Sequence, residues 1–163
     1  MRLYLRLVLF CAAVAFFGGT MVGPLIAIKG VGPDFTILAL VILALAGGSI
    51  PGTIGGFVLG LIQDLATPNL LGLQALCKTG LGFALGRLRG RLVHGMPLVE
   101  ATVIALSVVA HDLVFLVLKA NLFSDSNFMS LLTRTLPAAA YTGLIGIPLL
   151  RLADYLGLLH QED

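Results

Sequence analysis

The chain has 163 residues, of which 58% are hydrophobic and only 11% are charged. Soluble domains carry about 25% charged residues, so water cannot surround most of this surface. The net charge of +2 is too small to indicate a nucleic-acid-binding protein. The composition therefore predicts a protein embedded in membrane lipid.

The apolar residues occur in long continuous runs, which predict helices. Spanning the roughly 30 Å hydrocarbon core takes about 20 apolar residues in a helix, whereas barrel strands alternate polar and apolar residues. We predict one all-α domain over residues 1–163 with six transmembrane helices. Their approximate bounds are 5–28, 35–46, 50–65, 70–88, 97–119 and 128–156.

The first apolar run starts like a signal peptide but continues to Ile28, which is long enough to span, so we expect a retained helix. The second and third helices are short for full spans. Pro33 and Asp34 are suitable residues for the start of the second helix.

The basic residues predict the orientation, because Lys and Arg concentrate on the cytoplasmic side. One side carries six basic residues: Arg2, Arg6, Arg87, Arg89, Arg91 and Arg151. The other side carries three: Lys29, Lys119 and Arg134. We therefore expect both termini in the cytoplasm.

Two rows of glycine recur at every fourth residue. The first row is Gly52, Gly56 and Gly60, in the third helix; the second is Gly82, Gly86 and Gly90, at the end of the fourth. Such stripes let a neighbouring helix backbone approach closely. Packing between helices of this chain is the favoured interpretation, and docking of a partner protein's helix is the alternative.

Polar residues at membrane depth are candidate sites, because an ionisable group there is costly unless it is paired or hydrated. Asp64 is either a proton- or ligand-binding carboxylate or a cap for the fourth helix, through the turn containing Pro68 and Asn69; capping is favoured. Gln63 is placed to hydrogen-bond across helices.

Three more ionisable residues lie within the fourth and fifth helices. Lys78 either extends toward the membrane surface or pairs with Asp64 or Asp112. His111 and Asp112 are adjacent, and adjacent side chains on a helix point about 100° apart. We therefore expect that they cannot form one catalytic pair with each other without help from another helix, and that satisfied interior polar contacts are their role.

The sequence contains none of the motifs HExxH, GxSxG, GxxxxGK[ST] or GxGxxG, so we expect no enzymatic activity and no cofactor. Cys11 and Cys77 stand singly within apolar runs. They are interpreted as small apolar packing residues, and we expect no metal site.

Two stretches of the chain are distinctive: "GPDFTILALVILAL" (residues 32–45) and "GGFVLGLIQDLATPNLLGLQAL" (residues 55–76). In both, the chain resembles the MreD family of bacterial rod shape-determining membrane proteins: the first is similar to the family's entry to the second helix, and the second to its most characteristic run. The matching residues are Gly56, Gly60, Gln63, Asp64, Gly72, Leu73, Ala75 and Leu76. The basic "GRLRGR" segment after the fourth helix also fits, whereas Gln74 stands where the family often carries histidine.

The resemblance implies a non-enzymatic component of the elongation machinery in the bacterial inner membrane. It implies binding to the membrane helix of MreC and, indirectly, to MreB filaments, the polymerase RodA and a penicillin-binding transpeptidase. It also implies a fold similar to the six-helix S-components of energy-coupling-factor transporters.

Two functions stay open from the sequence. The leading one is a scaffold that holds MreC and helps control side-wall peptidoglycan synthesis, with the glycine stripes as the partner interface. The alternative is a transporter-like protein that binds a small molecule or lipid precursor, with four polar residues converging inside the bundle: Asp64, Lys78, His111 and Asp112.

Overall fold

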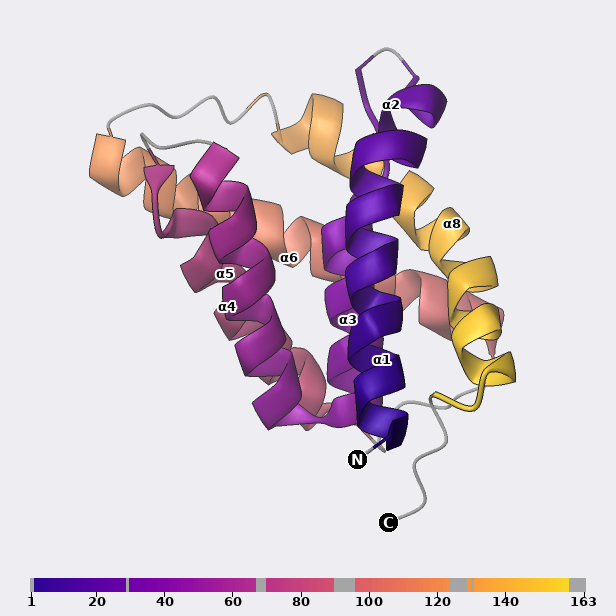
Figure 1. The fold of residues 1–163 in the computed structure, drawn as a ribbon. Helices are drawn as coiled ribbons and strands as arrows, with labels where there is room; N and C mark the ends of the chain where they lie inside the picture. The colour runs from indigo at the N-terminus through magenta and orange to yellow at the C-terminus, as the bar shows by residue number, and fades with distance from the viewer. Residues whose placement is uncertain are drawn as a thin grey trace.

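The computed structural model describes residues 2–28, 30–66, 70–89, 96–123, 129 and 131–158. Within these ranges the chain is helical, with no strand, and forms six rods (Figure 1). The first rod joins α1 (Arg2–Ala13), the π-helix η1 (Val14–Val22) and α2 (Gly23–Ile26); the last joins the π-helix η3 (Leu131–Thr135) and α8 (Leu136–Tyr155). Between them lie α3 (Phe35–Gly47), α4 (Ser49–Ala66), α5 (Leu73–Arg87) and α6 (Pro97–Phe123). The prediction of an all-α, six-helix protein is confirmed.

Four of the six rods are long and apolar enough to cross a membrane: the first, α4, α6 and the last. The helices α3 and α5 have only 13 and 15 residues. At 1.5 Å per residue they are about 20 and 22 Å long, less than the roughly 30 Å hydrocarbon core. By length and composition, then, the described residues contain four candidate spans where six were expected.

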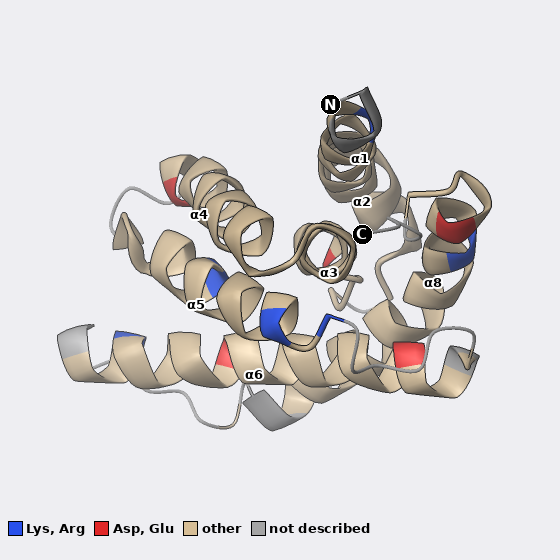
Figure 2. Cartoon of the chain, turned by 90° about the horizontal axis from the view of Figure 1, so that it is seen from below, with Lys and Arg blue, Asp and Glu red and all other residues tan. Residues whose placement is uncertain are grey.

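The short helix α3 is the centre of the bundle. Eleven of its residues are buried, from Phe35 to Ala46, because its sequence is apolar on every side. It contacts α1, η1, α4, α5, α6 and α8. Figure 2 shows α3 nearly end-on among these helices, with α6 crossing at a steep inclination. Since protein surrounds it, α3 does not need the length of a lipid-facing span.

The start of α3 follows from its sequence. The Asp34 side chain accepts hydrogen bonds from the backbone N–H groups of Thr36 and Ile37. It therefore satisfies donors that have no partner inside the helix. The helix ends at Gly47, and the next residue, Gly48, has a φ of +89°, which suits glycine; α4 begins directly after it.

Some helix bounds differ from those expected. The fourth helix begins at Leu73 instead of Leu70, because residues 70–72 form a turn in which Gly72 has a φ of +95°. The fifth helix continues to Phe123. The last begins at Leu131, and residue 128 lies outside the described residues.

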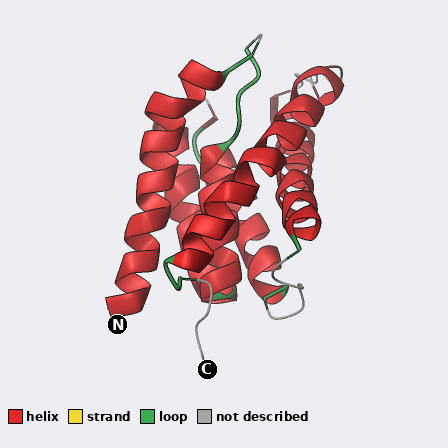
Figure 3. Ribbon diagram, turned by 90° about the vertical axis from the view of Figure 1, so that its right-hand side faces the viewer, coloured by secondary structure: helices red, strands yellow, loops and turns green. Residues whose placement is uncertain are grey.

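The connections alternate between the two ends of the bundle (Figures 1 and 3). The first rod begins, and α3, α5 and α8 end, at one end of the molecule (Figure 1). Large apolar side chains remain exposed on the outer faces of the bundle, for example Phe16, Ile54, Leu98 and Leu144. Such a surface suits lipid, and the protein is a membrane protein.

Candidate functional site

The carboxylate of Asp64 holds the start of α5. It is fully buried and accepts backbone N–H bonds from Gly72 at 3.0 Å, Gln74 at 3.0 Å and Ala75 at 2.9 Å. The first turn of a helix has free donors and a partial positive charge. Asp64 at the end of α4 therefore caps α5. Pro68 and Asn69 of the same turn lie outside the described residues.

The glycine rows join α4 to α5. A Cβ added at Gly56 would overlap the backbone of Lys78, and one at Gly60 the backbone of Ala75. Gly52 and Gly82 meet backbone to backbone, and Gly86 lies against the backbone of Ser49. These five glycines therefore pack the two helices of one chain together, as the favoured interpretation expected. Gly90 lies outside the described residues.

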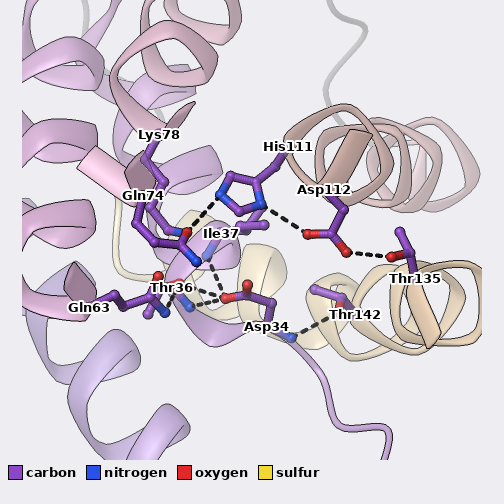
Figure 4. A network of polar contacts seen from close by, with 10 residues as sticks. All are labelled: Asp34, Thr36, Ile37, Gln63, Gln74, Lys78, His111, Asp112, Thr135 and Thr142. Carbon is purple, nitrogen blue, oxygen red and sulfur yellow. Dashed lines mark hydrogen bonds and ion pairs between the residues drawn. The ribbon is translucent and has the colours of Figure 1, made fainter. Parts of the chain in front are cut away.

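Lys78 is fully buried where α5 faces α6 (Figure 4). Its Nζ lies 3.0 Å from Oε1 of Gln74, one turn earlier, and 3.1 Å from Nε2 of His111 on α6. Nε2 of His111 is also 3.0 Å from the Gln74 oxygen. The expected hydrogen bond or ion pair to Asp64 or Asp112 is not found; the amine instead joins Gln74 and His111.

His111 and Asp112 bond to each other directly. Nδ1 of His111 lies 3.0 Å from Oδ1 of Asp112. The 100° spacing therefore does not keep the two side chains apart, because both can turn back toward one another. The other carboxylate oxygen of Asp112 accepts a 2.6 Å hydrogen bond from the Thr135 hydroxyl of η3. The pair therefore connects α5 to the last rod.

A second set of contacts extends from α4 through α3 to α8. Gln63 donates from Nε2 to the Thr36 hydroxyl at 3.0 Å, as its predicted cross-helix role requires. The Thr36 hydroxyl donates to the Asp34 carboxylate at 2.6 Å. The backbone N–H of Asp34 donates to the hydroxyl of Thr142 on α8 at 3.0 Å. Figure 4 shows Asp34 between Thr36 and Thr142, below the contact of Gln74 with His111.

Together these residues form an interior polar belt, which comprises Asp34, Thr36, Gln63, Gln74, Lys78, His111, Asp112, Thr135 and Thr142. Its contacts can orient protons and brace helices. Among the described residues, no group of three or more His, Cys, Asp and Glu could hold a metal ion. The belt fixes the relative positions of helices, which contact between apolar surfaces alone would not do in lipid.

Sequence reasoning did not assign a site role to the three threonines of the belt. Thr36, Thr135 and Thr142 are short hydroxyl residues whose side chains can bond to their own helix, so each alone is a weak signal. Their occurrence in apolar helices was the available clue, since such hydroxyls often bond across membrane helices.

Comparison with known proteins identifies the family. The family model for rod shape-determining protein MreD matches residues 1–155. No curated protein and no solved structure matches at a significant level. The family match covers every helix described above, and the chain belongs to the MreD family of rod shape-determining proteins.

Proposed function

We propose that this chain is a non-enzymatic scaffold, one six-helix domain in the bacterial inner membrane, that binds the membrane helix of MreC. Through MreC it acts on MreB, RodA and a penicillin-binding transpeptidase, and so helps control side-wall peptidoglycan synthesis. Membership of a rod shape-determining family supports a role in the cell-shape machinery.

The internal pairing of the polar belt is the observation that carries the scaffold proposal. Lys78 bonds to Gln74 and His111, and Asp112 bonds to His111 and Thr135. Buried polar groups that are bonded to one another fix how helices pack. A bundle braced in this way is suited to present a constant outer surface to a partner.

The partner surface must lie away from the glycine stripes. Their close approach fills the space between α4 and α5, which leaves no room there for a partner helix. Replacing Gly56 or Gly60 by Leu would therefore disturb the fold itself, so these changes cannot test partner binding.

Photo-crosslinking from each outer face tests the scaffold. A crosslinking residue replaces one exposed residue at a time in full-length protein in native membranes: Phe17, Ile54, Leu106 or Leu144. We expect one face to crosslink to the membrane helix of MreC, identified by mass spectrometry, and the other faces to yield lipid adducts. Lipid adducts from every face, with no MreC product from any, would contradict the proposal.

The second candidate is a small-molecule or lipid-binding protein with a fold like the S-components of energy-coupling-factor transporters. The convergence of Lys78, Gln74 and His111 from two helices favours it, together with the partial exposure of Asp34 and Asp112. Native mass spectrometry of the purified chain tests it. A stoichiometric small molecule that is lost from Lys78→Ala, without loss of MreC, would favour this candidate.

A further inference from the structure

The contact between Lys78 and His111 limits how many protons the two side chains can hold. Their nitrogens are 3.1 Å apart, which is hydrogen-bond distance, so one of them must offer a lone pair. An ammonium group and an imidazolium ring have donors only. Counted from a neutral amine and a neutral imidazole, the contact can therefore form with at most one excess proton on the two side chains.

Gln74 does not relieve this limit. Its side-chain oxygen lies 3.0 Å from both Nζ of Lys78 and Nε2 of His111. This oxygen can accept a bond from either nitrogen, but it does not provide the acceptor that the direct contact between the two nitrogens requires. If both carried a proton, two cations would face each other across 3.1 Å inside the membrane, where repulsion is poorly screened.

The surrounding charges nevertheless favour a second proton. On the other side of the ring, Asp112 accepts from Nδ1 of His111 and from Thr135, and Asp34 accepts three bonds on one oxygen. Asp34 and Asp112 both act electrostatically on Lys78 in favour of its charged form, although burial of the amine opposes that form more strongly. With one excess proton on the pair and both carboxylates ionised, these four groups carry a net charge of about −1, and a second proton would neutralise them.

The other titratable groups that act on Lys78 are Asp64, from α4, and Cys77, from α5 itself. The Asp64 carboxylate accepts bonds from three backbone N–H groups at the start of α5. The last rod contributes hydroxyl groups: Thr135 of η3 bonds to Asp112, and Thr142 of α8 bonds to the backbone of Asp34. The nearby carboxylates therefore favour a second proton on Lys78 and His111, whereas the hydrogen bond between these two side chains excludes it.

We propose that the Lys78–His111 contact is a proton-sensitive latch between α5 and α6, closed with at most one excess proton on the pair and opened when a second proton binds. The open form binds more protons than the closed form, so acidification shifts the equilibrium toward opening. In the open form, Lys78 faces Asp34 while His111 keeps its bond to Asp112. The latch would change the packing of the bundle without requiring any ligand.

Electron-spin distance measurements across the two helices test the latch. The full chain is placed in lipid nanodiscs, Cys11 and Cys77 are replaced by Ala, and labels are attached through Leu76→Cys on α5 and Val114→Cys on α6, both exposed positions. On going from about pH 8 to about pH 5, the range in which histidine titrates, we expect the mean distance to lengthen. An increase of about 2 to 3 Å corresponds to one water molecule, about 2.8 Å across, entering the contact.

Two variants test whether a second proton on Lys78 and His111 causes the change in distance. His111→Gln keeps an acceptor for Lys78 but cannot take a proton, and Lys78→Met removes the competing donor. Both are expected to give a distance that does not change with pH. A pH-independent distance in the unsubstituted pair, or equal lengthening in His111→Gln, would overturn the latch.

Nitrogen NMR of histidine-labelled protein gives a test that keeps Lys78 and His111 intact. The sequence has three histidines, so His94→Asn and His160→Asn leave His111 as the only labelled ring. We expect the imidazolium signal to appear over the same pH range as the lengthening. An imidazolium signal at a pH where Lys78 is still an ammonium group and the distance is unchanged would also overturn the latch.

Discussion

At the scale of single residues, Asp64 and Thr135 show how this chain uses polar groups inside an apolar bundle. Each connects two separate helical segments instead of bonding within its own. Asp64 joins the end of α4 to the start of α5, and Thr135 joins η3 to α6. In lipid, where apolar burial does not drive helices together, such bonds contribute directly to which helices pair.

Replacing Asp64 by Ala should destabilise the fold substantially. The change removes the acceptor of three backbone N–H groups in a buried position, and each buried donor left unsatisfied costs about 1 to 3 kcal/mol. We expect a total loss of about 2 to 4 kcal/mol because water or a shift of the turn would satisfy some of the donors. Asp64→Asn, which keeps one acceptor oxygen, should fall between Ala and the unaltered chain. Thermal unfolding followed by circular dichroism in nanodiscs measures this order, and an Asp64→Ala melt that equals the unaltered chain would refute the cap.

Replacing Thr135 by Val should cost about 1 to 2 kcal/mol, since it removes the hydroxyl that donates to Asp112 but hardly changes the shape. Thr133 provides the matched control: it lies two residues earlier on the same π-helix, is exposed, and donates to the carbonyl of Met129 within its own segment. Thr133→Val should leave the melting temperature nearly unchanged. Equal effects of the two substitutions would show that the bond to Asp112 contributes nothing.

At the scale of elements, the pairing of α4 with α5 is the most extensive helix contact in the described structure. It depends on glycine because the two backbones touch at Gly52, Gly56 and Gly82. The short helix α5 is thereby held against a full-length span. That packing explains how a helix of 15 residues can persist in a bundle whose lipid-facing rods are longer.

The glycines of this chain should differ sharply in their tolerance of alanine. Gly56→Ala places a Cβ against the backbone of Lys78, which cannot rotate away, so we expect a loss of about 1 to 3 kcal/mol from overpacking. Gly80, on the exposed face of α5, has no atom within 4 Å of an added Cβ. Gly80→Ala should be neutral or stabilising by up to about 1 kcal/mol through helix propensity. The melting temperatures of Gly56→Ala and Gly80→Ala, measured in one lipid composition, test this difference. Equal melting temperatures would contradict the close packing of α4 against α5.

At the scale of the whole molecule, basic residues gather at the end where the first rod begins and where α5 and α8 end. Arg6 lies near the start of α1, Arg87 ends α5, Arg89 follows it, and Arg151 is near the end of α8. Lys119 and Arg134 belong to the segments on either side of the α6–η3 connection, at the other end (Figure 1). Because positive loops stay in the cytoplasm, this separation agrees with the expectation that both termini lie in the cytoplasm.

Reporter fusions should place both ends of the chain in the cytoplasm. A fluorescent protein that matures only in the cytoplasm should be bright at either terminus, and alkaline phosphatase there should be inactive. The same phosphatase inserted after Phe123, in the α6–η3 connection, should be active. Phosphatase activity at the C-terminus would refute the orientation.

The sequence determined the properties that depend on neighbouring residues. Continuous apolar runs predicted six helices in a membrane, and the every-fourth glycines predicted close helix packing. The resemblance over residues 55–76 indicated the MreD family, which the match over residues 1–155 confirmed. These conclusions rest on hydropathy, period and motif, which can be read along the chain.

Only the tertiary structure decided which groups meet. Lys78 and His111 are 33 residues apart, and nothing in their spacing along the chain specifies a 3.1 Å contact. The same is true of Asp112 with Thr135, and of the central place of α3 among five other rods. Hydropathy assigns a residue to the membrane but not to a partner, because pairing depends on how helices turn and slide against one another.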